Sequence, residues 1–290
     1  MAIRPKTLFA SLAPVILGLT SATMFNHQNL DLNIALITML CALILQIASN
    51  LANDYLDALK GVDNEKRLGP TRVTSQGLIP QHHMRYALIF TLFLAFVLGT
   101  YLMFAGGVPI MIVGFLSLYF AYGYTGGPFP LSYNGLGEVA AFIFFGVVAV
   151  NGTYYLQTHL LNLNVVFLSI GPGAISACIL AINNLRDIKS DSASHKKTIA
   201  VRFGERFQRF LCLALIFISI VVVILSAISL QFKWLLIPTL LPFFFIKTWL
   251  QIYQGPIDSN LNNALQKTAI YNLFYCLFLS MGIYLSMKYY

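Results

Sequence analysis

Two separate stretches of the chain carry the same polar pattern. Asn53 and Asp57 in the first match Asn183 and Asp187 in the second, and Asp191 follows four residues later. Residues four apart lie one above another on a helix, so each stretch should present its oxygen groups as a stripe on one face. Carboxylate and carboxamide oxygens suit Mg²⁺, which keeps waters and recruits substrate phosphates. The pattern therefore predicts a site for a metal ion and a diphosphate.

Positively charged side chains accompany both stretches. In the same loops they would neutralise the phosphate oxygens that the metal leaves free. A single pattern of this kind beyond a membrane helix is ordinarily a solvated helix end, but two copies with matching asparagines favour a site. The cations are Lys60, Lys66, Arg67, Arg72, Arg186, Lys196 and Lys197.

The rest of the chain is apolar. Of its 290 residues, 58% are hydrophobic and only 10% are charged, which indicates a membrane protein. Segments of this length and composition can cross a hydrocarbon core of about 30 Å as helices. Nine such segments are predicted, at 8–25, 34–51, 87–105, 108–124, 139–155, 163–182, 210–228, 234–252 and 269–287.

The predicted fold is an all-α bundle of nine transmembrane helices forming one domain over residues 1–290. Only helices or closed barrels satisfy their backbone groups inside a bilayer, and continuous apolar runs exclude a barrel. With the N-terminus in the cytoplasm, all Lys and Arg except Lys233 and Lys288 fall on or near the cytoplasmic side. Both polar stretches then lie in cytoplasmic loops, 52–86 and 183–209, with the active site facing the cytoplasm.

The net charge of +8 reflects the Lys and Arg residues on the cytoplasmic side of the membrane. Their distribution does not resemble a nucleic-acid-binding surface. The four cysteines lie singly in predicted helices and suit packing. A diphosphate at the surface of an apolar bundle suggests a lipid diphosphate whose tail lies between helices. The alternative class is a transporter, but transport usually needs charged groups near the midplane, and no acidic residue lies mid-helix.

Four sequence motifs resemble those of the UbiA superfamily of intramembrane aromatic prenyltransferases. The similarity is closest to the branch that prenylates 1,4-dihydroxy-2-naphthoate in menaquinone synthesis, and it extends from the first predicted helix to the start of the seventh. The motifs are RPKTL at 4–8, NDYLDALKGVDNEKRLGPTRVTSQGLI at 53–79, YTGGPFPLSYNGLGE at 124–138 and NNLRDIKSDSASHKKTIAVRFG at 183–204.

The resemblance implies roles for residues in both stretches. Asn53, Asp57, Asn183, Asp187 and Asp191 would bind Mg²⁺ and diphosphate. The superfamily has a third acidic residue where this chain has Gly61, so Asp63 is a further candidate metal ligand. The implied diphosphate cations are Lys60, Arg72, Arg186 and Lys197, with Arg72 and Lys197 foremost.

An allylic diphosphate reacts by releasing diphosphate and leaving a carbocation, which needs dry, electron-rich surroundings. Tyr122 or Tyr124 could supply these, or could belong to an interfacial aromatic belt; the resemblance favours Tyr124. Glu138 could contact the aromatic acceptor or complement a helix N-terminus. Arg4 could hold the acceptor's carboxylate or anchor the chain at the membrane.

The expected function is Mg²⁺-dependent transfer of a polyprenyl chain from its diphosphate to 1,4-dihydroxy-2-naphthoate, with loss of CO₂, to give a demethylmenaquinone. The expected location is the cytoplasmic (inner) membrane, with the lipid bilayer as surroundings. Another aromatic acceptor, such as 4-hydroxybenzoate, is the alternative within the same class of enzyme.

Overall fold

The computed structural model describes residues 2–26, 29–61, 68–69 and 72–289. All regular secondary structure within these ranges is helical, which confirms the all-α fold class. Short turns of 3-10 helix, η1 (Leu131–Tyr133) and η3 (Lys233–Leu240), and of π-helix, η2 (Ile143–Val148), join some of the α-helices. The α-helices are α1 (Pro5–Asn26), α2 (Leu32–Leu59), α3 (Gln81–Gly123), α4 (Gly137–Phe142), α5 (Ala149–Thr158), α6 (Leu163–Arg186), α7 (Ile188–Ala193), α8 (Ile199–Leu230), α9 (Leu241–Phe244), α10 (Ile246–Gln254) and α11 (Leu261–Lys288).

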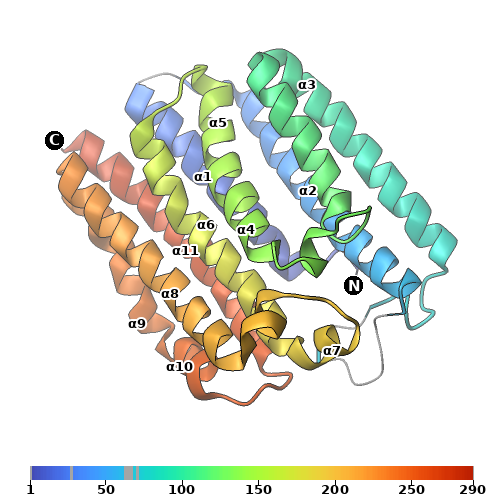
Figure 1. The fold of residues 1–290 in the computed structure, drawn as a ribbon. Coiled ribbons are helices and arrows are strands. Elements are labelled where there is room, and N and C mark those ends of the chain that lie inside the picture. Colours follow the sequence, from blue (N-terminus) through green and yellow to red (C-terminus); the bar gives the residue numbers. More distant parts are fainter. Residues whose placement is uncertain (1, 27–28, 62–67, 70–71, 290) are drawn as a thin grey trace.

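The helices identify a multi-pass membrane protein. In the described part of the chain, seven helical stretches are long and apolar enough to cross a membrane, and a bent pair makes an eighth. The predicted count of nine is therefore not confirmed. One of the seven, α3, is 43 residues long and breaks at Gly107, whose φ of 68° and ψ of −157° suit only glycine. This break lies between the predicted segments 87–105 and 108–124, and Figure 1 shows α3 as two adjacent arms.

The prediction of one continuous helix over 234–252 is wrong. The chain forms η3, α9 and α10, and the pieces 233–244 and 246–254 meet at 54°. Pro238 and Pro242 explain the interruption, because proline has no N–H for the helical ladder and its ring clashes with the preceding turn. The buried side of the segment, with Leu235 and Leu241, packs against α8 and α11, and its other side is exposed.

Helix α6 forms the centre of the bundle and packs against α4, α8 and α11. Small residues let its neighbours approach closely, as in other membrane helix pairs. A Cβ on Gly173 would lie 2.9 Å from the carbonyl oxygen of Phe142, and one on Gly171 would lie 2.0 Å from the Tyr275 hydroxyl oxygen. This close packing holds α6 against its neighbours, and the second polar stretch lies at the end of this helix.

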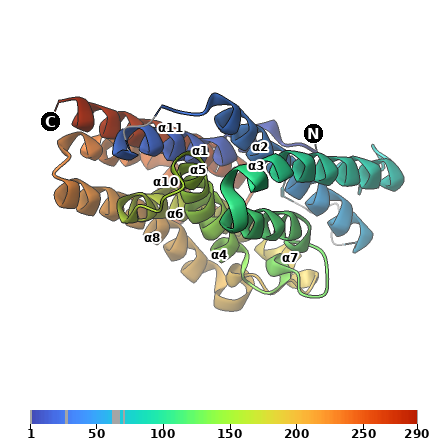
Figure 2. The same cartoon turned by 90° about the horizontal axis from the view of Figure 1, so that it is seen from above.

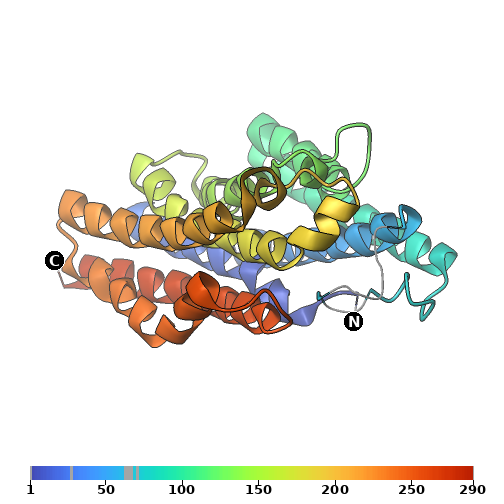
Figure 3. The same cartoon turned by 60° about the horizontal axis from the view of Figure 1, so that its bottom comes forward.

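The arrangement of the helices brings the two polar stretches to one end of the bundle. Figure 1 shows the N-terminus, α7 and the last turns of α2 toward one end, with the C-terminus at the other. Seen from above in Figure 2, α2 and α3 lie on one side and α8, α10 and α11 on the other. Figure 3 shows α7 beside the end of α2. Segments far apart in sequence therefore surround a common space.

Candidate active site

A cavity of about 400 Å³ lies between the helices at this end of the bundle. One part of its wall is polar and includes residues from both sequence stretches. The remainder is mainly apolar and extends between α2, the two arms of α3, and α5. The polar part includes Asn53, Asp57, Arg72, Asn183, Asp187, Asp191 and Lys196, and the apolar part includes Cys41, Leu102, Met103, Ile110 and Leu156. This shape suits a molecule with a charged head and a greasy tail.

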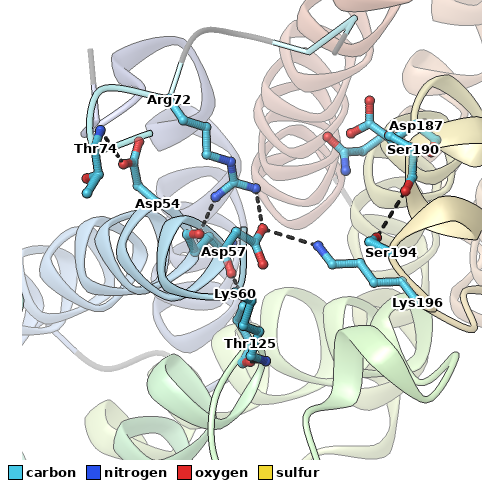
Figure 4. Close-up of polar contacts among 12 residues, drawn as sticks. Asp54, Asp57, Lys60, Arg72, Thr74, Thr125, Asp187, Ser190, Ser194 and Lys196 are labelled. Atoms are coloured by element: carbon cyan, nitrogen blue, oxygen red, sulfur yellow. Dashed lines mark hydrogen bonds and ion pairs between the residues drawn. The ribbon is translucent and has the colours of Figure 1, made fainter. Parts of the chain in front are cut away.

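Asp57 lies in the last turn of α2 and holds two cations. Only 2% of the residue is exposed. Its Oδ2 accepts from Nη2 of Arg72 at 2.5 Å and from Nζ of Lys196 at 3.1 Å (Figure 4). The Tyr133 hydroxyl donates to Oδ1 at 3.4 Å. Hydrogen bonds between ionised groups are stronger than neutral ones, so Asp57 organises the cations at this wall.

Asp54, from the same polar face of α2, holds the segment that carries Arg72. Its two carboxylate oxygens accept from the backbone N–H groups of Val73 and Thr74 at 3.2 and 3.1 Å. Arg72 also donates to the carbonyl oxygen of Asn53, and the Thr125 hydroxyl donates to the side-chain oxygen of Asn53. Asp54 thus positions the segment, while Asn53 and Asp57 line the cavity.

The second polar stretch spans a break between two helices. Helix α6 ends at Arg186, Asp187 has φ −94° and ψ 9°, and α7 begins at Ile188. The N–H of Asp191 nevertheless donates to the carbonyl oxygen of Asp187 at 2.8 Å. Asn183, Asp187 and Asp191 all line the cavity, so the predicted grouping persists although the predicted continuous helix does not.

Arg186 is committed to contacts within the protein. Its Nε and Nη2 donate to the two carboxylate oxygens of Asp187 at 2.8 and 2.6 Å, and Nη2 also donates to Oδ1 of Asn183 at 2.8 Å. Its Nη1 donates to Oδ1 of Asn262, on α11, at 2.7 Å. Arg186 is 2% exposed and lies behind the cavity wall. It holds Asn183 and Asp187 in place and does not face the cavity directly.

Lys196 joins the second loop to the first motif. It is 8% exposed, lines the cavity and pairs with Asp57. Lys197 is one of the four predicted diphosphate cations, but it is exposed and is not part of the cavity wall. Its backbone N–H donates to the carbonyl oxygen of Tyr133 at 3.0 Å. Neighbouring side chains of this loop point in different directions, and it is Lys196 that points toward the cavity while Lys197 is exposed.

Lys60 lies beside the cavity, in a smaller adjoining pocket that it shares with Tyr133. Its Nζ donates to the carbonyl oxygen of Thr125 at 2.8 Å and lies 4.0 Å from the centroid of the Tyr133 ring. The Nζ of Lys196 lies 5.0 Å from the same ring. Burial lowers the pKa of Lys60, an effect that Asp57 opposes. Burial and Asp57 raise the pKa of Tyr133, so its ring stays neutral between the two cations.

Tyr124 follows α3 directly and lines the cavity together with Arg4. Burial raises the pKa of Tyr124, and the negative charges of Glu138, Asp191 and Asp57 raise it further, while Arg4 acts in the opposite direction. Tyr122 is 39% exposed and lies outside the cavity wall. Of the two tyrosines considered from the sequence, Tyr124 is therefore the one whose ring can meet a bound molecule.

Glu138 is buried, with 4% of the residue exposed, and it lies behind the cavity wall. Its Oε1 accepts from Nδ2 of Asn184 at 2.9 Å and from Nε2 of Gln208 at 3.0 Å. Glu138 occupies the first turn of α4 but makes these contacts with α6 and α8. The position of Glu138 in the first turn of α4 agrees with the helix-end interpretation, and the hydrogen bonds to Asn184 and Gln208 are an additional role that the sequence did not indicate.

One predicted metal ligand, Asp63, lies outside the described residues. The site also contains groups that the sequence did not single out, namely Thr125, Tyr133 and Asn184. The first two belong to the glycine- and proline-rich loop after α3, and the composition of that loop was the one signal in the sequence.

Gly61 follows the end of α2 with a φ of 61°. Glycine favours this left-handed conformation, which explains why no acidic residue occupies the position.

The oxygen groups of the cavity fit Mg²⁺ in kind. Asn53, Asp57, Asn183, Asp187 and Asp191 bring carboxamide and carboxylate oxygens to one cavity, and Mg²⁺ prefers such ligands together with waters and phosphates. In the described ranges, no three His, Cys, Asp or Glu side chains form a compact metal-binding group by themselves. Asp57 and Asp187 are paired with cations.

The fold and the cavity together define a multi-pass, all-helical membrane protein with a charged pocket at the end of an apolar cavity. The family model described as the UbiA prenyltransferase family matches residues 11–284. The chain therefore belongs to the UbiA prenyltransferase family, and the protein is a prenyltransferase.

Two relatives illustrate the similarity in sequence. The 1,4-dihydroxy-2-naphthoate octaprenyltransferase of Escherichia coli is 41% identical over 209 residues, covering 70% of this chain and 67% of that one. The enzyme of the same name from Bacillus subtilis is 30% identical over 288 residues, covering 98% and 91%.

Solved structures show the same fold at lower identity. A UbiA homolog from Archaeoglobus fulgidus, bound to DMAPP and Mg²⁺, aligns with a TM-score of 0.67 at 15% identity, over 97% of each chain. An apo UbiA homolog from Aeropyrum pernix aligns with a TM-score of 0.68 at 14% identity, over 97% of this chain and 98% of that one.

Proposed function

We propose that this protein transfers a polyprenyl chain from its diphosphate to 1,4-dihydroxy-2-naphthoate, with release of diphosphate and CO₂, to form a demethylmenaquinone. The observation that carries the proposal is the shared cavity. Two Asn/Asp motifs and the cations beside them line one end of it, and apolar side chains line the rest. The acceptor is taken from relatives named 1,4-dihydroxy-2-naphthoate octaprenyltransferase.

The first step breaks the bond between the allylic carbon and the diphosphate oxygen, and the electron pair leaves with the diphosphate. The cations at the cavity wall stabilise the negative charge that develops on this leaving group. Arg72 and Lys196 are suited to this, since both contact Asp57 at the polar end of the cavity. They are held in position before the reaction, so little reorganisation is needed when the charge develops.

Asn53, Asp57, Asn183, Asp187 and Asp191 are the residues that would hold Mg²⁺. When bound, the ion supplies further positive charge to the phosphate oxygens. Solved UbiA homologs bound to Mg²⁺ with DMAPP or with GPP support a role for the ion. The carboxylates also keep the cations of the loops oriented toward the same space, as the pairs of Asp57 with Arg72 and Lys196 illustrate.

The second step forms the carbon–carbon bond. The acceptor carbon that bears the carboxylate attacks the allylic cation, and the carboxylate then leaves as CO₂, returning its electron pair to the ring. The ring of Tyr124 lines the cavity and remains neutral because its pKa is raised. Its π face can stabilise the cation while the apolar wall excludes water. Arg4, on the same wall, is the candidate contact for the acceptor's carboxylate.

The proposed location is the cytoplasmic (inner) membrane, with the N-terminus and the active site facing the cytoplasm. The uneven distribution of Lys and Arg along the sequence supports this orientation. The cavity's polar residues and the N-terminus lie toward the same end of the bundle, which agrees with it.

The test is a reaction of the purified protein with a polyprenyl diphosphate, Mg²⁺ and either 1,4-dihydroxy-2-naphthoate or 4-hydroxybenzoate, with products weighed by mass spectrometry. We expect a product from the naphthoate that has lost its carboxylate. Asp57→Asn and Asp187→Asn should each reduce the rate by about 100-fold or more, since each removes a carboxylate that would hold Mg²⁺ and that pairs with a cation at the site. Chelation with EDTA should abolish the reaction reversibly.

Asp258→Asn is the matched control, because Asp258 lies in the turn before α11, where its carboxylate accepts hydrogen bonds from the backbone and side chain of Asn260. It should leave the rate unchanged. A product that retains the carboxylate, formed only from 4-hydroxybenzoate, would overturn the choice of acceptor. Full activity in both motif variants would overturn the choice of site.

A further inference from the structure

One part of the cavity wall, formed by the end of α3, η2 and α6, has a polar group that the two Asn/Asp motifs do not include. Tyr124, Phe144, Leu180 and Asn184 all line this part. Asn184 is 7% exposed and follows Asn183 of the second motif. A carboxamide set among aromatic and aliphatic side chains is suited to orient a ring-shaped ligand, because directional polar groups in an otherwise apolar pocket determine how a ligand lies.

The carboxamide of Asn184 is held by a buried network. Its Nδ2 donates to Oε1 of Glu138 at 2.9 Å, and the same oxygen accepts from Nε2 of Gln208 at 3.0 Å. Nε2 of Gln208 also donates to the carbonyl oxygen of Ala181 at 3.0 Å. Glu138 and Gln208 are 4% and 0% exposed. The network connects α4, α6 and α8 directly behind the cavity wall.

This network determines which end of the carboxamide a ligand can meet. A carboxylate only accepts hydrogen bonds, so Glu138 selects the nitrogen of Asn184 as its partner. The carbonyl oxygen of Asn184 is then the group available to the cavity, and it can only accept. A ligand that hydrogen-bonds here must donate, and a hydroxyl on an aromatic ring is such a donor.

We propose that Asn184 accepts a hydrogen bond from a ring hydroxyl of the aromatic acceptor, and that Glu138 and Gln208 are positioning residues that fix the Asn184 carboxamide for this contact. The inference rests on the proposed function and extends it, because it names a specificity-determining residue. It also gives Glu138 a role that acts through Asn184. Selectivity follows, since an acceptor without the hydroxyl leaves the buried carbonyl oxygen unpaired.

The test measures KM for each substrate separately. In Glu138→Gln, the new amide can donate to the oxygen of Asn184, which lets the carboxamide turn its nitrogen toward the cavity. We expect KM for 1,4-dihydroxy-2-naphthoate to rise about 10-fold or more, while KM for the polyprenyl diphosphate stays within about twofold. The advantage of 1,4-dihydroxy-2-naphthoate over its monohydroxy analogue, 1-hydroxy-2-naphthoate, should shrink.

A double variant provides the rescue. In Glu138→Gln with Asn184→Asp, the glutamine amide donates to the aspartate, whose other oxygen again faces the cavity as an acceptor. Acceptor KM should return toward the wild-type value, which a merely structural role would not produce. Asn151→Ala is the control for loss of a buried asparagine, because Asn151 is 8% exposed and lies outside the cavity wall; it should leave both KM values unchanged.

Asn184→Ala, which removes the carboxamide, gives a second measurement if Glu138→Gln fails to fold. It should raise acceptor KM selectively in protein that elutes as a single species. An unchanged acceptor KM in the folded variants, or an equal rise for both substrates, would overturn the inference while leaving the proposed function intact. Absence of any naphthoate product from the wild-type protein would contradict the proposed function itself.

Discussion

At the scale of single residues, the pairing of Asp57 distinguishes two neighbouring lysines. Lys196 is buried and lies 3.1 Å from the carboxylate, whereas Lys197 is exposed. A charge-assisted hydrogen bond contributes about 1.5–3 kcal/mol, or a factor of about 10 to 100. Lys196→Met should therefore lower kcat/KM for the prenyl diphosphate by about this factor, while Lys197→Met should change it less than threefold.

Steady-state rates over a range of diphosphate concentrations check this pair, and the two variants serve as controls for each other. Both remove one positive charge from the same loop, so a general effect of net charge would affect them equally. A larger loss in Lys197→Met would mean that the exposed lysine, and not the buried one, contacts the diphosphate.

The raised pKa of Tyr124 predicts how activity depends on pH. Burial and three carboxylates disfavour the phenolate, so the group stays a neutral phenol below its ordinary pKa of about 10. Tyr124→Phe should therefore keep the pH profile of the wild type between about pH 6 and 9. Tyr124→Leu removes the ring and should lower the rate by about 30-fold, the effect of about 2 kcal/mol of cation–π stabilisation.

Rates of the two variants measured across this range provide the check. The phenylalanine variant is the control for the hydroxyl, and the leucine variant tests the ring. A pH step that disappears in Tyr124→Phe would mean that the phenol ionises during turnover. Equal losses of rate in both variants would mean that the hydroxyl, and not the π face, is responsible for the contribution of Tyr124.

The sequence could predict the residues that repeat but not those that meet through folding. Asn53, Asp57, Asn183 and Asp187 stand out because the same spacing occurs twice. Tyr133 and Asn184 have no such pattern, since one lies in an irregular loop and the other is an ordinary neighbour of Asn183. Which of Lys196 and Lys197 faces inward depends on backbone direction after α7, and the residue types alone carry no information about it.

At the scale of helices, the two arms of α3 form part of the apolar wall of the cavity. Gly114 on the second arm faces Met103 on the first, and a Cβ on Gly114 would lie 2.4 Å from the terminal methyl carbon of Met103. Both residues line the cavity. A larger side chain at Gly114 must push Met103 aside and fill space that a prenyl tail would occupy.

Gly114→Leu should therefore shift the preferred donor toward shorter chains. We expect kcat/KM for a long polyprenyl diphosphate to fall about 10-fold or more relative to geranyl diphosphate, since burying several methylene groups contributes about 0.8 kcal/mol each. Val108→Leu, on the exposed face of the same arm at 61% exposure, is the control and should leave the ratio unchanged. An equal loss for both donors would place the tail elsewhere.

Helix composition predicted most of the spans, and the one clear failure has an identifiable cause. The division between segments 87–105 and 108–124 agrees with the break of α3 at Gly107. Segment 234–252 is apolar enough to span the membrane, but Pro238 and Pro242 within it interrupt the helix. Hydropathy predicts that a segment lies within the membrane, whereas its prolines and glycines determine where the helix breaks.

At the scale of the whole molecule, the site joins two halves of the sequence. Asp57 follows the second predicted span and Asp187 follows the sixth, and both line one cavity. A ligand that bridges these halves binds only the folded arrangement, so it should stabilise the protein against unfolding. At a concentration 100-fold above its Kd, the expected stabilisation is about 2.7 kcal/mol.

This linkage predicts that Mg²⁺ and diphosphate act together. Since Mg²⁺ prefers oxygen ligands that include phosphates, each alone should raise the Tm of the purified protein little, and the two together should raise it by several degrees. Asp57→Asn and Asp187→Asn should each remove most of the joint effect, because either change takes away one half of the bridge. Asp258→Asn should retain it. A full rise in Tm with pyrophosphate under EDTA would mean that the cations, chiefly Arg72 and Lys196, bind the diphosphate without a metal ion.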